Sequence, residues 1–426
     1  QWLLKLPTIE DTTMKTKPRV ILAAGIAVFM LLFSYWMTTQ PFALSGETAL
    51  MRKIELVRGW FKPHINPMAD SVLLVNVSYD PVLVGVNDSY GLPAGFGNIT
   101  DRHKLVQFLT ELKKRDDYKF IMMDILFADD IHTEADSALF NLIATMDRIV
   151  IASNYYGELS DERLYEKAGL TNYFTNYKNV SFAKYPYIVD GQKSMPLKVY
   201  EEVTGRHISD HGLFSTDGYR LVRKSIVLPF ELRCDSAYTL DGEKTWYNLG
   251  MDLLGNKYQY ENDTIQGNDE LYANPDLTRG KYIVVGAFSS GDMHYSYLEN
   301  QPGPAIIFNA YLSLLHGHHF VSFWVFILLA CSYFMLSYLI VGQQTVEEAI
   351  TENGESKNKI VSTFQRMFRG IASWIGYSMF LTILCCITYL WMGEVYDIFI
   401  TALLFEIVSV IVNRIYKIKN RRSHAK

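Results

Sequence analysis

The sequence predicts an α/β domain, with a mostly parallel sheet flanked by helices and an irregular insertion, attached to four transmembrane α-helices. Three observations predict this class. Apolar strands alternate with amphipathic helices between residues 71 and 152, and four apolar runs are each long enough to cross a bilayer. The chain of 426 residues is 49% hydrophobic and only 20% charged, whereas soluble domains are about a quarter charged.

The four membrane segments are predicted from length, because a helix needs about 20 apolar residues to cross the hydrocarbon core. They are Val20–Thr39, Phe320–Val341, Ile371–Met392 and Asp397–Tyr416. The first resembles a signal peptide in its preceding basic residues. Its apolar run exceeds the roughly 7–15 residues of a cleavable signal, which favours a membrane anchor.

Orientation is predicted from the basic residues beside these segments, which favour the cytoplasmic side. Basic residues precede the first segment, lie between the second and third, and follow the fourth; none lies in the turn 393–396. The expected order is a cytoplasmic start (1–19), an extracytoplasmic domain (40–319), a cytoplasmic loop (342–370) and a basic cytoplasmic tail (417–426).

The expected outer domain is acidic. Residues 40–319 contain 26 Lys and Arg against 36 Asp and Glu, a net charge of −10, within a chain whose net charge is −5. Binding to nucleic acid depends largely on neutralising phosphates, so this charge excludes nucleic acid as a partner.

Within the outer domain, the periodicity predicts a βαβαβ unit with both faces of its sheet covered. Continuous apolar runs predict strands, and apolar residues at three- and four-residue steps predict helices. The strands are Ser71–Val77, Phe120–Leu126 and Ile149–Ala152; the helices run from the capping segment Asn98–Asp101 to Arg115 and over Asp136–Met146.

The rest of the domain is less regular. We expect another strand at Lys281–Val285, a helix at Ala305–Leu315, and an insertion at Asn154–Asn274 with a hairpin, Phe214–Leu228, that turns at Asp217-Gly218. Cys234 is the single cysteine outside the apolar runs, which argues against a disulfide framework.

No catalytic constellation is found, so the sequence predicts a protein that is not an enzyme. The segment Gly286–Gly291 follows a strand as a phosphate-binding loop does, but it lacks the Lys and Ser/Thr of that motif. A tight turn at the strand end is the favoured interpretation.

A candidate ligand site is predicted where strands end, because open α/β sheets bind ligands at the carboxyl edge. Asp124 lies near the end of one strand, and Asp129 and Asp130 follow it. Asp292 and His294 follow a later strand and are expected at the same edge. Such carboxylates suit a hard divalent cation, although no cofactor or metal is otherwise indicated. Alternatively, Asp136 caps a helix, and Asp129, Asp130 and Glu134 are solvated.

Three further residues are singled out. Arg102 and Arg220 would suit an anionic ligand, or they form salt bridges with nearby Asp residues. Glu406 lies near the middle of the fourth apolar segment, where a carboxyl group normally faces protein. We expect Glu406 to contact another helix, in this chain or in a partner protein.

Several stretches together resemble the type-two CHASE family, a bacterial extracellular sensory module. They cover about 250 residues in the family's order: MADSVLLVNVSYD (68–80), ITDRHKLVQFLTELKKRDDYKFIMMDILFADD (99–130), EADSALFNLI (134–143), STDGYRLVRK (215–224), GKYIVVGAFSSGDMH (280–294) and PGPAIIFNAYLSLLHG (302–317). The resemblance implies a periplasmic sensory domain in a bacterial inner-membrane protein.

The sequence also departs from that family. Arg220 and Arg223 flank the family's usual arginine position, Ser296-Tyr297 replaces a Thr-Pro, and ten residues follow Tyr416 where the family has an output domain. Two functions are therefore expected. One is a sensor that relays a signal to a separate partner protein. The other is a non-catalytic subunit of an envelope complex, with the domain as a docking surface. Both imply a lipid bilayer, protein partners and an oligomer or complex.

Overall fold

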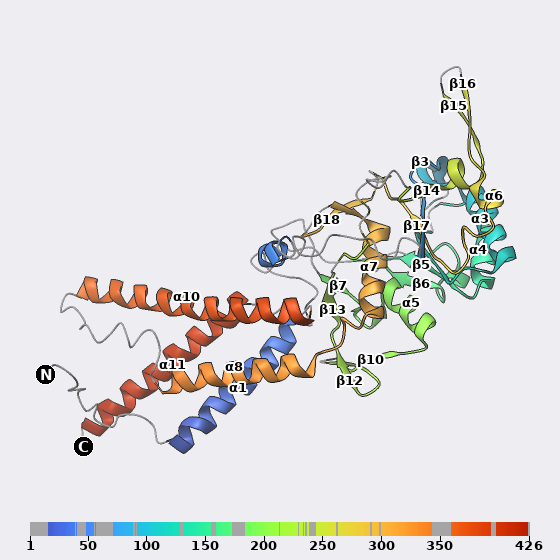
Figure 1. Ribbon diagram of the computed structural model, residues 1–426. Coiled ribbons are helices and arrows are strands. Elements are labelled where there is room, and N and C mark those ends of the chain that lie inside the picture. Colours follow the sequence, from blue (N-terminus) through green and yellow to red (C-terminus); the bar gives the residue numbers. More distant parts are fainter. Residues whose placement is uncertain are drawn as a thin grey trace. The chain divides into compact units, whose positions relative to one another are not determined.

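The chain forms two compact units, 40–320 and the combination of 1–39 with 321–426. Figure 1 traces both in the computed structural model. The described residues are 16–38, 40, 48–54, 56, 71–87, 90, 92–127, 131–154, 159–172, 184–212, 214–228, 230–232, 234, 237, 244–260, 263–289, 292–297, 300–342, 359–392 and 398–424.

The centre of the first unit is a six-stranded sheet in which every neighbouring pair is parallel. Its order is β14-β1-β17-β4-β5-β6. The strands are β14 (Tyr247–Asn248), β1 (Val72–Asn76), β17 (Tyr282–Gly286), β4 (Phe120–Leu126), β5 (Ile149–Ser153) and β6 (Ala168–Leu170). The predicted parallel α/β sheet is thus confirmed. The two edge strands come from the segment that we expected to be an irregular insertion.

Helices cover both faces of the sheet. On one face, α3 (Arg102–Arg115) and α4 (Asp136–Thr145) pack on alternate strand residues such as Ile121, Ile151 and Ile283. On the other face lie α5 (Met195–Thr204) and α7 (Gly303–Leu315), with Tyr282 against the α7 ring of Phe308. The central strands β1, β17 and β5 therefore bury both of their faces, which explains their almost continuous apolar sequences.

Local signals place these helices where the sequence predicts them. The Asp101 side chain accepts hydrogen bonds from the backbone N–H groups of His103 and Lys104, which caps α3. Asp136 does not cap α4; the first helical residue is Asp136 itself, and its carboxylate accepts from the backbone N–H of Thr133. The α7 helix begins two residues earlier than expected, because Pro304 favours the first turn.

Two glycines let helix N-termini approach the carboxyl edge of the sheet. A Cβ on Gly286, at the end of β17, would overlap Pro304 of α7. A Cβ on Gly169, in β6, would overlap the backbone of Met195 at the start of α5. Both positions therefore require the smallest side chain.

The expected hairpin at Phe214–Leu228 is different in detail. Strand β11 (Ser215–Asp217) pairs with β12 (Arg220–Val222) through Asp217 and Arg220, so the turn is Gly218-Tyr219, one residue later than predicted. Gly218 has a φ of 58°, as the first turn residue of a tight hairpin requires. A third strand, β10 (Ile208–Asp210), joins β11, while β13 (Ser225–Val227) pairs with β7 (Lys184–Pro186).

Four smaller strand pairs complete this unit. They are β2 (Pro81–Asn87) with β3 (Pro93–Thr100), β8 (Ile188–Val189) with β9 (Gln192–Lys193), β15 (Lys257–Tyr260) with β16 (Asp263–Gln266), and β18 (Met293–Tyr295) with β19 (Asn300–Pro302). Short helical turns lie at η2 (Glu162–Leu164), η3 (Leu249–Leu253) and α6 (Glu270–Ala273). In Figure 1, the β15–β16 ribbon projects from the unit.

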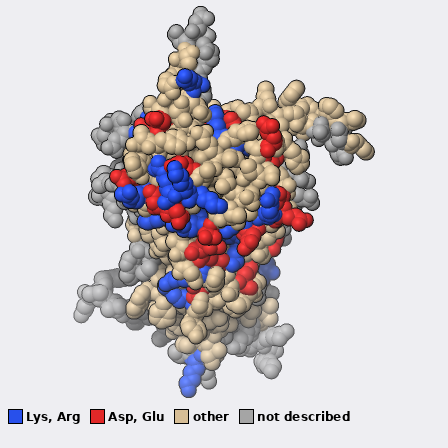
Figure 2. All heavy atoms as spheres, turned by 90° about the vertical axis from the view of Figure 1, so that its right-hand side faces the viewer, with Lys and Arg blue, Asp and Glu red and all other residues tan. Residues whose placement is uncertain are grey.

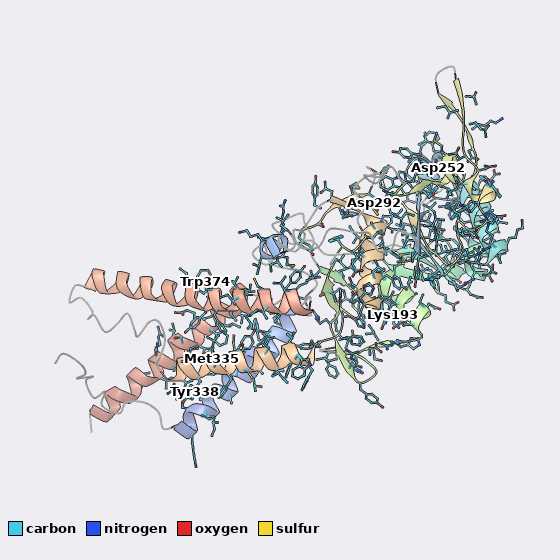
Figure 3. The ribbon with its side chains drawn as sticks, in the orientation of Figure 1. Lys193, Asp252, Asp292, Met335, Tyr338 and Trp374 are labelled. Carbon is cyan, nitrogen blue, oxygen red and sulfur yellow. The ribbon has the colours of Figure 1, made fainter. Side chains whose placement is uncertain are left out.

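The described residues of the second unit form four helices: α1 (Thr16–Thr38), α8 (Phe323–Val341), α10 (Lys359–Met392) and α11 (Ile398–His424). The α1 helix packs on α8, and α11 packs on both α8 and α10. The Ser34 hydroxyl lies 2.8 Å from that of Tyr333, whose ring meets Phe405 edge-on. Figure 3 draws the side chains of both units.

Among the described residues, two helices are long and apolar enough to span a membrane, Lys17–Met37 and Phe323–Val341. Four such spans were predicted. The apolar part of α10, Trp374–Leu390, is shorter than a full span. A membrane span, a signal sequence and a buried helix can have the same length and composition.

Candidate ligand cavity at the carboxyl edge of the sheet

A cavity of about 250 Å³ lies where β4 and β17 end. The chain leaves β4 towards α4 on one face and leaves β17 towards α7 on the other. Adjacent strands whose connections diverge in this way open a crevice, which is the usual ligand position in open α/β sheets. The lining residues are Asp124, Asn154, Thr171, Asn172, Asp292, His294, Gly303, Ile306 and Ile307.

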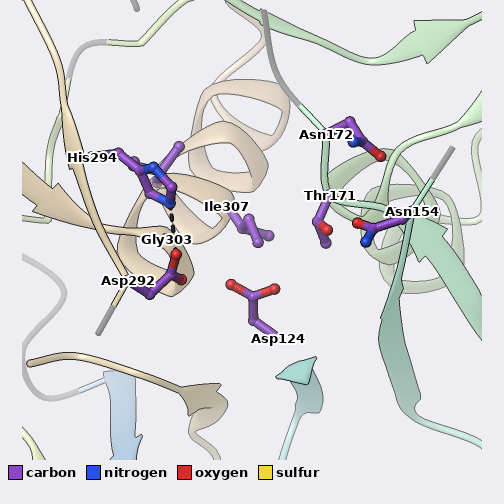
Figure 4. A pocket seen from close by; sticks show the side chains of 9 residues that line it. Asp124, Asn154, Thr171, Asn172, Asp292, His294, Gly303 and Ile307 are labelled. Carbon is purple, nitrogen blue, oxygen red and sulfur yellow. Dashed lines mark hydrogen bonds and ion pairs between the residues drawn. The ribbon is translucent and has the colours of Figure 1, made fainter. Parts of the chain in front are cut away.

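Each wall of the cavity has a distinct origin, as Figure 4 shows. Asp124 comes from β4, and Asp292 and His294 come from the segment that follows β17. Asn154 follows β5, and Thr171 and Asn172 follow β6, so these three form the wall opposite Asp292. The first turns of α7 contribute Gly303, Ile306 and Ile307.

The Asp292 side is fixed by hydrogen bonds. His294 Nε2 lies 2.7 Å from Asp292 Oδ1. The backbone N–H of Gly303 donates to the Asp292 carbonyl at 2.9 Å, and the β18–β19 pairing carries the chain from His294 to α7. A Cβ on Gly303 would overlap the Asp292 carboxylate. Glycine therefore allows this carboxylate to lie against the beginning of α7, where the helix dipole favours negative charge.

Asp124 has an unusual environment. It is surrounded by protein and partly open to the cavity, and among the described residues its carboxyl group makes no hydrogen bond or ion pair. Burial raises the pKa of Asp124 from 3.8 to about 8, and the charge of Asp292 adds to the effect. The carboxyl group is therefore mostly protonated at neutral pH, and it becomes a strong acceptor when it loses its proton.

A network of asparagines supports the neighbouring strand ends. The Asn76 amide donates to Asn248 at 2.8 Å, joining β1 to β14. The side-chain oxygen of Asn76, Oδ1, accepts hydrogen bonds from the backbone N–H groups of Ser78 and Phe288. This buried residue has a positioning role, because it holds the chain that leaves β17.

The expected convergence of Asp124, Asp292 and His294 is present in the structure. Asp129 and Asp130 lie outside the described residues. Glu134 is exposed and lies near His103, away from the cavity, and among the described residues no three His, Cys, Asp or Glu side chains are arranged to hold a metal.

The two predicted arginines do not line the cavity. Arg102 is buried and pairs with Asp136, in agreement with the salt-bridge alternative. The Arg220 guanidinium lies 3.5 Å from the ring centre of Phe320. Glu406 is half-buried on α11. Neither arginine is therefore placed to bind an anionic ligand in this cavity.

Three polar side chains of the cavity were not predicted, namely Asn154, Thr171 and Asn172, and neither were Gly303, Ile306 and Ile307 of α7. Asn154 directly follows a correctly predicted strand, so the rule that ligands bind at strand ends would have found it. Thr171 and Asn172 follow β6, which has only three residues and no readable periodicity.

No protein-family model matches the chain, and no curated protein or solved structure matches it either.

Proposed function

We propose that the chain is a receptor of the bacterial inner membrane. Its α/β unit faces the periplasm and binds a small molecule in the cavity at the ends of β4 and β17. Binding changes the arrangement of four transmembrane helices, which pass the signal to a separate partner protein. The receptor itself performs no chemistry. Its resemblance to the type-two CHASE family supports a sensory role.

The cavity is the observation that carries this proposal. It combines a ligand-sized space, convergent polar groups and a carboxyl group with a raised pKa, and such combinations mark binding sites. A ligand transmits a signal only if it binds two conformations with different affinity. The walls of the cavity come from four strand ends and from α7, so a movement of α7 relative to the sheet would change the affinity for the ligand.

The surface of the helical unit supports membrane insertion. Large apolar side chains are exposed on all four helices, including Ile21, Phe29, Trp324, Ile383, Leu390 and Ile411. Polar side chains such as Ser34, Ser337 and Thr401 are buried among the helices. Apolar groups outside and polar groups inside suit a lipid environment. Arg19 of α1 contacts Tyr338 near the end of α8, which fits two helices that cross in opposite directions.

Cysteine labelling in bacterial spheroplasts tests the orientation. In a variant without the four native cysteines, Tyr219→Cys lies on a fully exposed turn of the α/β unit, and Ser356→Cys lies in the sequence between α8 and α10. A membrane-impermeant maleimide should label Tyr219→Cys in intact spheroplasts and Ser356→Cys only after lysis. The opposite pattern would reject a periplasmic receptor.

The exposed hairpin β2–β3 favours a second candidate, an accessory subunit of an envelope complex. Leu83 is 74% exposed and Phe96 is 80% exposed, and Leu92 is also exposed. Exposed apolar residues that lie together mark protein interfaces. In this function, Leu83→Ser and Phe96→Ser should lower the yield of co-purified envelope proteins, whereas Tyr219→Ser on the other hairpin should not. Equal yields for all variants would reject docking through β2–β3.

A further inference from the structure

Among the described residues, the cavity is lined by two acidic side chains and by no Lys or Arg. Asp124 and Asp292 both face it, and the basic group among the lining residues, His294, is bonded to Asp292. Among the described residues, the Asp124 carboxyl group has neither a hydrogen bond nor a counter-charge. A carboxylate that is enclosed in this way is costly unless a cation or several donors approach it.

We propose that this cavity binds a small organic cation, a protonated primary amine on a short aliphatic chain. The inference rests on the proposed function, because it assigns a ligand class to the same cavity. The ammonium group donates to the carboxylates of Asp124 and Asp292. Its three N–H donors leave one for an oxygen of Asn154, Thr171 or Asn172 on the opposite wall.

The shape and the remaining wall favour an organic cation. Ile306 and Ile307 give the cavity an apolar side that suits a hydrocarbon chain. The volume of about 250 Å³ equals roughly eight water molecules in the liquid, so it suits a ligand with about that number of non-hydrogen atoms. Among the described residues, no three His, Cys, Asp or Glu side chains are grouped to hold a metal ion, whereas one ammonium group is satisfied by three acceptors.

Binding of an amine is coupled to the loss of a proton. Asp124 has a pKa of about 8 in the empty cavity, so the ammonium ion displaces a proton at neutral pH. Among the described lining residues, the other titratable groups are Asp292 and His294. Affinity should therefore rise about tenfold for each pH unit below pH 7, about fivefold between pH 7 and pH 8, and then level off.

Calorimetry on the full chain in detergent tests the proposal with 4-amino-1-butanol as the probe. Its neutral control is 1,4-butanediol, which has the same shape and lacks the charge. We expect the amine to bind at pH 8 at least tenfold more tightly than the diol, and about fivefold more weakly at pH 7 than at pH 8, because the ionised fraction of Asp124 changes by about that factor. Asp124→Asn should weaken binding at least tenfold and remove the pH dependence, and Asp292→Asn should also weaken it. Glu134→Gln, an exposed acid outside the cavity, should bind as the wild type does.

Each other outcome overturns the ammonium assignment. Equal or tighter binding of the diol indicates a neutral ligand, and unchanged binding by Asp124→Asn places the amine elsewhere. Absence of amine binding at pH 8, in protein whose thermal unfolding is normal, also rejects this ligand class. None of these results rejects a periplasmic receptor, because the labelling of Tyr219→Cys and Ser356→Cys tests that proposal separately.

Discussion

The fold places Asp124 where an ordinary carboxylate is unstable. The native state binds its proton more tightly than the unfolded chain, since its pKa is about 8 when folded and about 4 when unfolded. Its contribution to stability is therefore fully present below pH 4 and is lost as the pH rises to about 8. The same property makes the group responsive to a cation.

Asp124→Asn should consequently stabilise the α/β unit at alkaline pH. The neutral amide retains the size of the side chain and removes the cost of the buried charge. We expect a gain in the free energy of unfolding on the order of a few kcal/mol at pH 8.5, which disappears near pH 4. Thermal unfolding of both proteins across this range measures it. A gain of equal size at both pH values would mean that ionisation of Asp124 is not the cause.

The pKa of Asp136, which pairs with Arg102, is shifted in the opposite direction from that of Asp124. Burial alone would raise the pKa of Asp136, but hydrogen bonds from Arg102 and Thr133 outweigh it and lower the pKa. The Arg102 guanidinium also lies 5.7 Å from the ring centres of Phe127 and Phe140. The pair therefore joins the beginning of α3 to the beginning of α4.

Arg102→Met should destabilise the α/β unit by about 3–5 kcal/mol, because it leaves the Asp136 carboxylate without its buried partner. The double variant Arg102→Met/Asp136→Leu should recover most of this loss, since it removes both charges. Chemical unfolding at pH 7 measures both variants. Failure of the second substitution to restore stability would show that Arg102 acts through packing alone.

Among the elements, predictability follows length and burial. The sequence predicts β4 to the residue, because six of its seven residues are apolar and form a central strand, with Asp124 as the exception. It does not predict β14 or β6, which have two and three residues and gain their structure from the neighbouring strands. Half of the polar side chains that line the cavity were therefore predictable: Asp124, Asp292 and His294. The wall that follows β6 depends on tertiary pairing.

The junction of β17 and α7 offers a test at this scale. Gly286→Ala forces Pro304 to move, and this displaces the beginning of α7 from the sheet. We expect a loss of about 1–3 kcal/mol in stability and a change in the cavity, because α7 forms one of its walls. The control is Gly85→Ala on β2, where an added Cβ meets no atom within 4 Å.

Unfolding and amine binding should be measured for both glycine variants. A Gly286→Ala protein as stable as Gly85→Ala would mean that α7 adjusts without cost. Unchanged ligand binding, together with lowered stability, would mean that the first turn of α7 does not shape the cavity.

In the whole molecule, the net negative charge and the α/β unit lie in almost the same part of the chain. The segment 40–319 has a net charge of −10, and the α/β unit covers almost the same residues. Figure 2 shows acidic and basic side chains interspersed on one face of the molecule. Neighbouring charges of opposite sign stabilise little individually and keep the surface soluble. The second unit has apolar groups on its surface, so the two units suit different solvents.

Each unit has its own core, so substitutions in one should leave the other intact. Arg19 provides the test in the helical unit. Its guanidinium donates to the Tyr338 carbonyl from Nη2 at 3.0 Å and lies 3.8 Å from the centre of the Tyr338 ring. Arg19→Met should weaken the packing of α1 on α8 by about 1–2 kcal/mol, through loss of the hydrogen bonds and the cation–π contact. Lys17→Met removes an exposed charge at the same end of α1 and should have little effect. Thermal unfolding in detergent should be monitored in two ways. Cross-linking between α1 and α8 reports on the helical unit, and amine binding reports on the α/β unit. A loss of amine binding in Arg19→Met at temperatures where the α/β unit of the wild type is folded would mean that the two cores are not independent.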